Sequence, residues 1–127
     1  MGMEQRVEFG SSGCPVWAGV AELLSRSSFP VEMRMIDSQL AFPDEMPPDD
    51  WRELRVGTPA GMITIRRQPQ GVDLVTWGNA DAALVQAWNA LTWAFAMCSG
   101  GNVTTPQGSR TAEEYRQQAS MPASLKE

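Results

Sequence analysis

The stretch from Gly61 to Cys98 constrains the fold more than any other part of the sequence. Residues 62–67 and 72–77 are rich in the β-branched and aromatic side chains that favour strands. Between them stands Gln68-Pro69-Gln70-Gly71, in which proline presets φ and glycine tolerates positive φ. A turn this short joins antiparallel neighbours. We therefore predict a β-hairpin over residues 62–77.

A long apolar helix follows the hairpin. Asn79 or Asp81 can cap its start by accepting a free backbone N–H, and Gly100-Gly101 ends it. Its apolar stripe repeats every three or four residues and consists of Leu84, Trp88, Leu91, Phe95 and Cys98. The opposite, wetter face is marked by Gln86, Asn89 and Thr92. These polar breaks argue against a membrane span, and we expect the helix over residues 80–98 to pack across the sheet.

The remaining chain adds strands, one more helix and a tail. Residues 4–9, 31–36 and 51–56 are expected to form strands, with Met33 and Met35 pointing inward. A helix is expected over residues 15–27, because Pro15 suits a first helical position. Residues 43–50 contain three prolines and are expected to form an acidic loop.

The predicted fold is α+β, with a domain over residues 1–101 and a polar C-terminal tail over 102–127. The order β-α-β-β-β-β-α implies a single antiparallel sheet of four to five strands, with the helices packed on one face. Thr111 to Glu114 resembles a capping box, so the tail is expected to hold a short helix over 112–119. The element order resembles that of the TATA-binding-protein-like and helix-grip folds. Such folds host unrelated functions, so this resemblance implies no activity.

Charge and cysteine content narrow the partners and the compartment. The net charge of −5 disfavours nucleic acid and anionic membrane surfaces, but it does not exclude a basic or apolar protein partner. The two cysteines, Cys14 and Cys98, are far apart in the sequence and lack metal-ligand spacing. We expect a cytoplasmic protein with reduced thiols, and a Cys14–Cys98 disulfide is the alternative.

No residue pattern predicts catalysis, so we lean towards a protein that is not an enzyme. The chain has no histidine, which removes the Ser-His and Cys-His pairs and the commonest zinc ligand. Cys14 stands near a predicted helix start, where a thiol pKa can fall, but no base accompanies it. The densest carboxylate group lacks EF-hand spacing and consists of Asp44, Glu45, Asp49, Asp50 and Glu53. We predict no cofactor and no metal site.

Five tryptophans and eight methionines are many for a chain of this size, and they lead to two hypotheses. The first is a non-catalytic protein-interaction module that binds a protein partner or a second copy of itself as a homodimer. Its interaction face would carry Arg34, Arg55 and Arg66, although such arginines often pair with cross-strand acids. The alternative is a binder of a small apolar ligand held between the sheet and the C-terminal helix. That site would be lined by Trp77, Trp88, Leu91 and Phe95.

Overall fold

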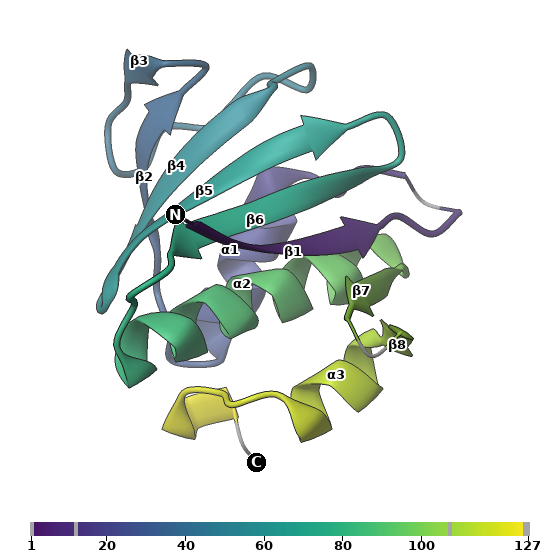
Figure 1. Cartoon of the computed structure of the whole chain (residues 1–127). Helices are drawn as coiled ribbons and strands as arrows, with labels where there is room; N and C mark the ends of the chain where they lie inside the picture. Colours follow the sequence, from purple (N-terminus) through teal and green to yellow (C-terminus); the bar gives the residue numbers. More distant parts are fainter. Residues whose placement is uncertain (1, 12, 107, 126–127) are drawn as a thin grey trace.

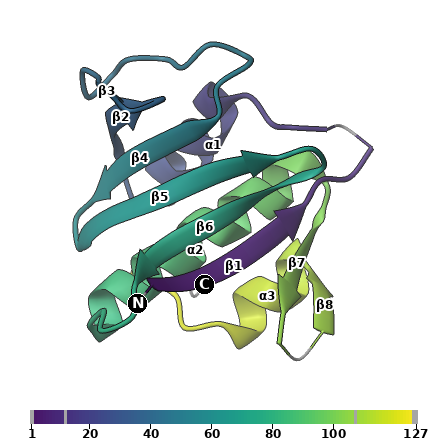
Figure 2. The same ribbon diagram turned by 45° about the horizontal axis from the view of Figure 1, so that its top comes forward.

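The computed structural model describes residues 2–11, 13–106 and 108–125. Within these residues it shows one open antiparallel sheet of eight strands and three α-helices. The helices cover one face of the sheet and leave the other face open (Figures 1 and 2). The predicted α+β class and single antiparallel sheet are confirmed, whereas the predicted number of four to five strands is wrong.

The strands do not follow one another across the sheet in chain order. The elements are β1 (Gly2–Glu8), α1 (Trp17–Arg26), β2 (Glu32–Ile36), β3 (Gln39–Leu40), β4 (Glu53–Thr58), β5 (Gly61–Gln68), β6 (Gly71–Trp77), α2 (Ala82–Ser99), β7 (Asn102–Thr105), β8 (Gly108–Thr111), α3 (Ala112–Gln118) and the 3-10 turn η1 (Ala123–Leu125). Across the sheet the order is β3-β2-β4-β5-β6-β1-β7-β8. The first strand therefore lies inside the sheet, between β6 and β7.

The additional strands lie at the two edges of the sheet. Asp37 and Ser38 adopt positive φ values of 50° and 70°, which turn the chain so that β3 pairs back onto β2. At the other edge, β7 pairs with β1 and β8 pairs with β7. Both β7 and β8 come from the polar segment after residue 101, where Val103 alone among these strand residues is buried.

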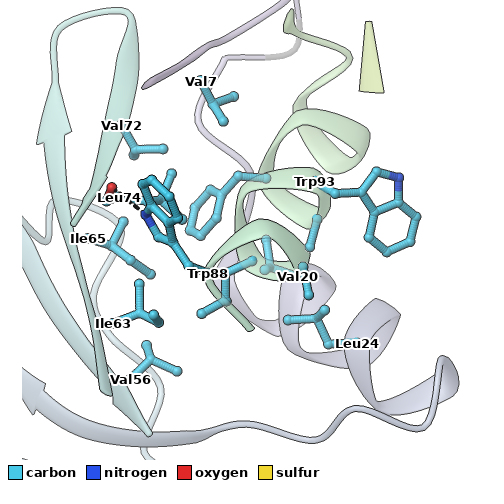
Figure 3. Packing of buried hydrophobic residues seen from close by; sticks show 14 of the residues in the cluster. Val7, Val20, Leu24, Val56, Ile63, Ile65, Val72, Leu74, Trp88 and Trp93 are labelled. Atoms are coloured by element: carbon cyan, nitrogen blue, oxygen red, sulfur yellow. Dashed lines mark hydrogen bonds between the residues drawn. The ribbon is translucent and has the colours of Figure 1, made fainter. Parts of the chain in front are cut away.

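The hairpin of β5 and β6 and the helix α2 form the centre of the core. Leu54, Ile65 and Leu74 are paired across β4, β5 and β6 and are fully buried beneath α2. Opposite them, the indole N–H of Trp88 donates to the carbonyl oxygen of Leu74 at 2.8 Å (Figure 3). Trp88 is therefore fixed by a hydrogen bond as well as by packing.

Helix α2 begins and ends with the expected caps. The carboxylate of Asp81 accepts a hydrogen bond from the backbone N–H of Leu84 at 2.9 Å, and Gly100 adopts the left-handed conformation with φ 64°. The wetter face expected at Asn89 and Thr92 is instead buried, because β1 and α3 cover it. The Asn89 amide donates to the carbonyl oxygen of Ser120 at 2.8 Å.

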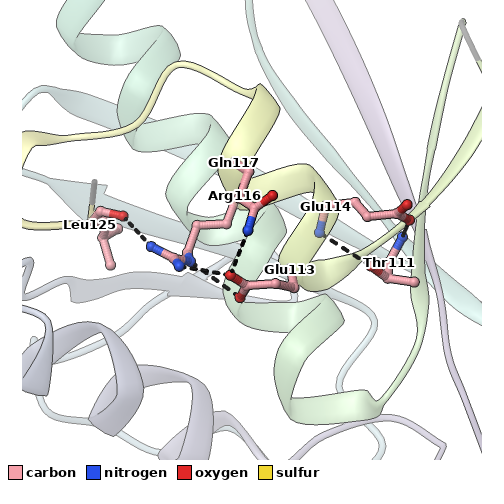
Figure 4. A network of polar contacts seen from close by, with 6 residues as sticks. All are labelled: Thr111, Glu113, Glu114, Arg116, Gln117 and Leu125. Carbon is pink, nitrogen blue, oxygen red and sulfur yellow. Dashed lines mark hydrogen bonds and ion pairs between the residues drawn. The ribbon is translucent and has the colours of Figure 1, made fainter. Parts of the chain in front are cut away.

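Helix α3 begins at a complete capping box. The Thr111 hydroxyl accepts from the backbone N–H of Glu114 at 3.2 Å, and the Glu114 carboxylate accepts from the backbone N–H of Thr111 at 3.0 Å (Figure 4). One turn later, Arg116 pairs with Glu113 at 2.8 Å and donates to the carbonyl oxygen of Leu125 at 3.0 Å. These contacts hold the described end of the chain against the domain.

A β-bulge in β2 changes which methionine faces the core. The pairing of β2 with β4 shifts register between Met33 and Met35. Met33 and Ile36 are buried, whereas Met35 pairs with Arg55 and is half-buried. The expectation that Met35 points inward beside Met33 is therefore wrong, because the extra residue reverses the alternation. Among the described helices, none has the length and apolar character that crossing a bilayer requires.

Candidate functional site

The open face of the sheet carries a shallow pocket whose walls are both apolar and cationic. The pocket has a volume of about 290 Å³ and is lined by Arg55, Met62, Thr64, Arg66, Val75, Thr76 and Trp77. These residues come from the three neighbouring strands β4, β5 and β6. We refer to this pocket and the outward side chains around it as the open-face site.

Two large apolar side chains of the open-face site are exposed to solvent. Trp77 is 67% exposed and Met62 is 41% exposed. Side chains alternate along a strand, and Leu74 points into the core, so Trp77 must point outward. A tryptophan this exposed beside a second exposed apolar side chain is the kind of feature that marks a binding surface.

The structure brings the three predicted arginines to this face, on the adjacent strands β2, β4 and β5. Arg66 pairs with Glu53 at 3.2 Å and Arg34 pairs with Glu32 at 3.3 Å. Arg55 makes no ion pair with any described residue. Of the three guanidinium groups, Arg55 is thus the one with its charge available to a partner.

Glycine at position 57 allows Arg34 to lie flat on the sheet. A Cβ placed on Gly57 would come within 2.7 Å of the Arg34 Nε atom. The stem of Arg34 therefore covers the backbone of β4 beside Met62, which is the cross-strand partner of Gly57. This arrangement extends the cationic part of the open-face site towards β2.

The four residues predicted to line a ligand site do not lie together. Trp88, Leu91 and Phe95 face the core on α2, and the latter two are fully buried. The Phe95 ring also packs against Trp17 of α1, with the ring centroids 6.2 Å apart. Trp77 lies on the opposite side of the sheet. A ligand between sheet and helix would therefore have to displace side chains that already fill the core.

A second groove, which the sequence did not reveal, lies between the start of α1 and the proline-rich loop over residues 43–50. It has a volume of about 430 Å³, and its walls include Val16, Trp17, Met46 and Trp51. Two of its lining side chains, Val16 and Met46, are large, apolar and exposed. The sequence signal for this groove is Met46, an apolar residue in an otherwise acidic, proline-rich loop.

The two cysteines are free and lie on different elements. Helix α1 begins at Trp17, so Cys14 stands before the helix and does not cap it. Its Sγ lies 3.6 Å from the carbonyl oxygen of Pro15. Burial raises the pKa of the Cys98 thiol, which favours the unreactive protonated form, although Arg26 acts in the opposite direction.

The carboxylates do not gather into a metal-binding group in the described part of the chain. Three or more metal-ligating side chains come together nowhere among the residues that the structure describes. Asp37 instead accepts hydrogen bonds from the backbone N–H groups of Arg52 and Glu53 at 2.7 and 2.9 Å. It therefore holds the β2–β3 turn to the start of β4.

Comparisons of this chain with protein-family models, curated proteins and solved structures found no match. Its function must therefore be argued from the geometry of its own residues.

Proposed function

We propose that this chain is a non-catalytic protein-interaction module that binds its partner through the open-face site. The observation that carries the proposal is Trp77, which is two-thirds exposed at the end of β6 and lines the same pocket as Met62 and Arg55. Aromatic residues, methionine and arginine are the residue types enriched at protein interfaces. The strands fix the backbone beneath these side chains, so binding does not have to order a loop.

The chemistry of the site defines the partner surface. Trp77 and Met62 require apolar side chains opposite them, since their exposed area gains most from being removed from water. Arg55 requires a carboxylate, because its guanidinium has no ion-pair partner among the described residues. The expected partner surface is therefore apolar with an acidic group at its margin.

The alternative, an apolar ligand between sheet and helix, has less support from the geometry. Leu91 and Phe95 are fully buried, and the Trp88 indole is hydrogen-bonded to Leu74. Ligand entry would break that bond and open a packed interior. A protein partner on the open face requires neither change.

A photo-cross-linking amino acid placed at position 62, in the cells that make the protein, tests the proposal. Its matched control carries the same amino acid at Ser25, an exposed position of α1 on the helix-covered side. We expect a protein adduct from position 62 that is lost when Trp77→Ala is added, and none from position 25. Equal labelling from both positions, or labelling that survives Trp77→Ala, would exclude the open face as the binding surface.

A further inference from the structure

We propose that the partner of the open-face site is a second copy of this chain, bound face to face about a two-fold axis. The axis runs along the strands, over the junction of β5 and β6. This inference rests on the proposed function and names the partner of the same site. It follows from the order of charges in the rows of residues that run across the open face.

The first row crosses four strands and alternates in charge. Cross-strand pairing places its members in the order Glu53, Arg66, Asp73, Arg6 over β4, β5, β6 and β1. Within one copy they form two ion pairs, Glu53–Arg66 at 3.2 Å and Asp73–Arg6 at 2.9 Å. A two-fold axis between β5 and β6 exchanges β5 with β6 and β4 with β1. Glu53 then faces Arg6 of the second copy, whereas Asp73 is buried beneath the Arg6 and Gln68 side chains of its own chain and only its position lies opposite Arg66.

The second row carries the unpaired charges. It runs Arg55, Thr64, Val75, Glu4 over the same four strands. Neither Arg55 nor Glu4 makes an ion pair with a described residue of its own chain. The same axis brings Arg55 of one copy opposite Glu4 of the other, and does so twice because the contact is symmetric. The second copy thus supplies the carboxylate that Arg55 lacks.

The same two-fold axis also brings the exposed apolar side chains of the two copies together. Met62 on β5 and Trp77 on β6 lie two residues beyond Thr64 and Val75, which are paired, and both line the same pocket. The axis therefore places Met62 of one copy against Trp77 of the other. Sulfur–aromatic contacts of this kind are favourable, and the contact removes both exposed side chains from water.

A two-fold axis perpendicular to the strands, in the plane of the sheet, would bring like charges together. It would carry the second row onto itself and place Arg55 against Arg55 and Glu4 against Glu4. Like charges in contact across an interface cost several kcal/mol. The two rows together hold three carboxylates and three arginines, so this face is locally neutral in a chain of net charge −5. The carboxylates are Glu53, Asp73 and Glu4, and the arginines are Arg66, Arg6 and Arg55. A locally neutral face with alternating charges is suited to pair with itself.

The area indicates a weak dimer. Four strands about 4.8 Å apart, and rows about 7 Å apart along the strands, outline a contact of roughly 400 Å² per copy. Standard stable interfaces bury about 800 Å² per partner. We therefore expect reversible association that depends on protein concentration in the micromolar range.

Sedimentation velocity of the full chain, from about 5 to about 500 µM, measures the dimer constant. Arg55→Glu and Glu4→Arg should each weaken association about tenfold or more, because each places like charges together at both symmetric contacts. The double variant, Glu4→Arg with Arg55→Glu, restores the opposite-charge contacts and should return the constant to within about threefold of wild type. Arg26→Glu on exposed α1 is the matched control and should leave it unchanged.

Three results would overturn the dimer: a wild-type monomer at the highest concentration, a double variant no better than the singles, or an equal loss in Arg26→Glu. The cross-linker at position 62 separates this failure from that of the proposed function. If the wild type is monomeric but position 62 labels another protein in a Trp77-dependent way, the interaction module stands and the second copy does not. If the cross-linker at position 62 labels no protein, both the interaction module and the dimer are contradicted.

Discussion

The hydroxyl oxygen of Tyr115 lies 2.5 Å from Oε1 of Gln5, a residue 110 positions earlier in the chain. It also lies 2.8 Å from Oδ1 of Asn89, and the Gln5 amide donates to that same Asn89 oxygen at 3.0 Å. A polar contact thus joins β1, α2 and α3 inside an otherwise apolar core. Tyr115 is almost fully buried, and burial is the main reason that its pKa is raised, although its side-chain hydrogen bonds with Gln5 and Thr92 oppose that shift.

Alkaline pH should unfold the protein through this tyrosine. Below about pH 10 the tyrosine is protonated in both folded and unfolded chains, so its contribution to stability is complete there. Above that pH the unfolded chain loses the proton while the folded chain keeps it, so the free energy of unfolding falls as pH rises. Because Tyr115 is the sole tyrosine, tyrosinate absorbance near 295 nm should rise together with loss of the circular dichroism signal. Tyrosinate that forms in a still-folded protein would contradict this.

Tyr115→Phe should destabilise the fold at neutral pH by about 1–3 kcal/mol, because it removes the hydroxyl donor from a network of part-buried amide oxygens. Urea denaturation at pH 7 measures the difference in the free energy of unfolding. The exposed substitution Ser109→Ala is the control and should change it by less than about 0.5 kcal/mol. Above about pH 10 the free energy of unfolding of Tyr115→Phe should also fall less steeply with pH than that of the wild type. The part of the fall that comes from the raised pKa of Cys98 should be the same in both proteins.

Trp88 and Trp77 should behave oppositely on substitution. Trp88→Ala leaves a cavity in the core and frees the Leu74 carbonyl, so a loss of about 3–5 kcal/mol is expected. Trp77→Ala removes an exposed side chain and should change the free energy of unfolding by less than about 0.5 kcal/mol. Both are measured by urea denaturation at a protein concentration low enough to keep the chain monomeric. A large loss for Trp77→Ala would place that side chain in the core.

Two glycine-to-alanine substitutions should also differ in sign. A Cβ on Gly19 of α1 meets no atom within 4 Å, so Gly19→Ala should stabilise the helix by about 0.5–1 kcal/mol. A Cβ on Gly101 would overlap the carbonyl oxygen of Glu8, part of the rigid strand β1. Gly101→Ala should therefore cost about 1–3 kcal/mol, and thermal unfolding of the two variants measures the contrast. A Gly101→Ala variant as stable as wild type would mean that β1 and β7 approach less closely.

The local signals of the sequence were sufficient for the centre of the fold. The turn at Pro69 and Gly71 defined the β5–β6 hairpin, and the Asp81 cap and Gly100 bounded α2. Strand alternation alone predicts that Arg34, Arg55 and Arg66 share one side of the sheet, and the structure has them there, while their role in an interaction stays a prediction. The same alternation, counted from Leu74, puts Trp77 on the open face, which is why it does not line a site with Trp88, Leu91 and Phe95.

Other features were not available from local patterns. A β-bulge adds one residue without a distinctive sequence, so the reversal at Met35 required the actual pairing of β2 with β4. Strands β7 and β8 are polar and short. They form through backbone hydrogen bonds, of β7 to β1 and of β8 to β7, which carry little sequence signal. The burial of Asn89 and Thr92 depends on α3 and β1, which are far away in the chain.

The position of β1 between β6 and β7 limits how early this protein can fold during its synthesis. Residues 2–8 are synthesised well before their sheet neighbours at 71–77 and 102–104. Residues 2–8 stay unpaired until β6 and β7 have been synthesised. The complete sheet can therefore form only after most of the chain has been translated. Such long-range pairing slows folding, so a nascent chain halted before Thr104 should hold β1 loosely and be the form most exposed to chaperones and proteases.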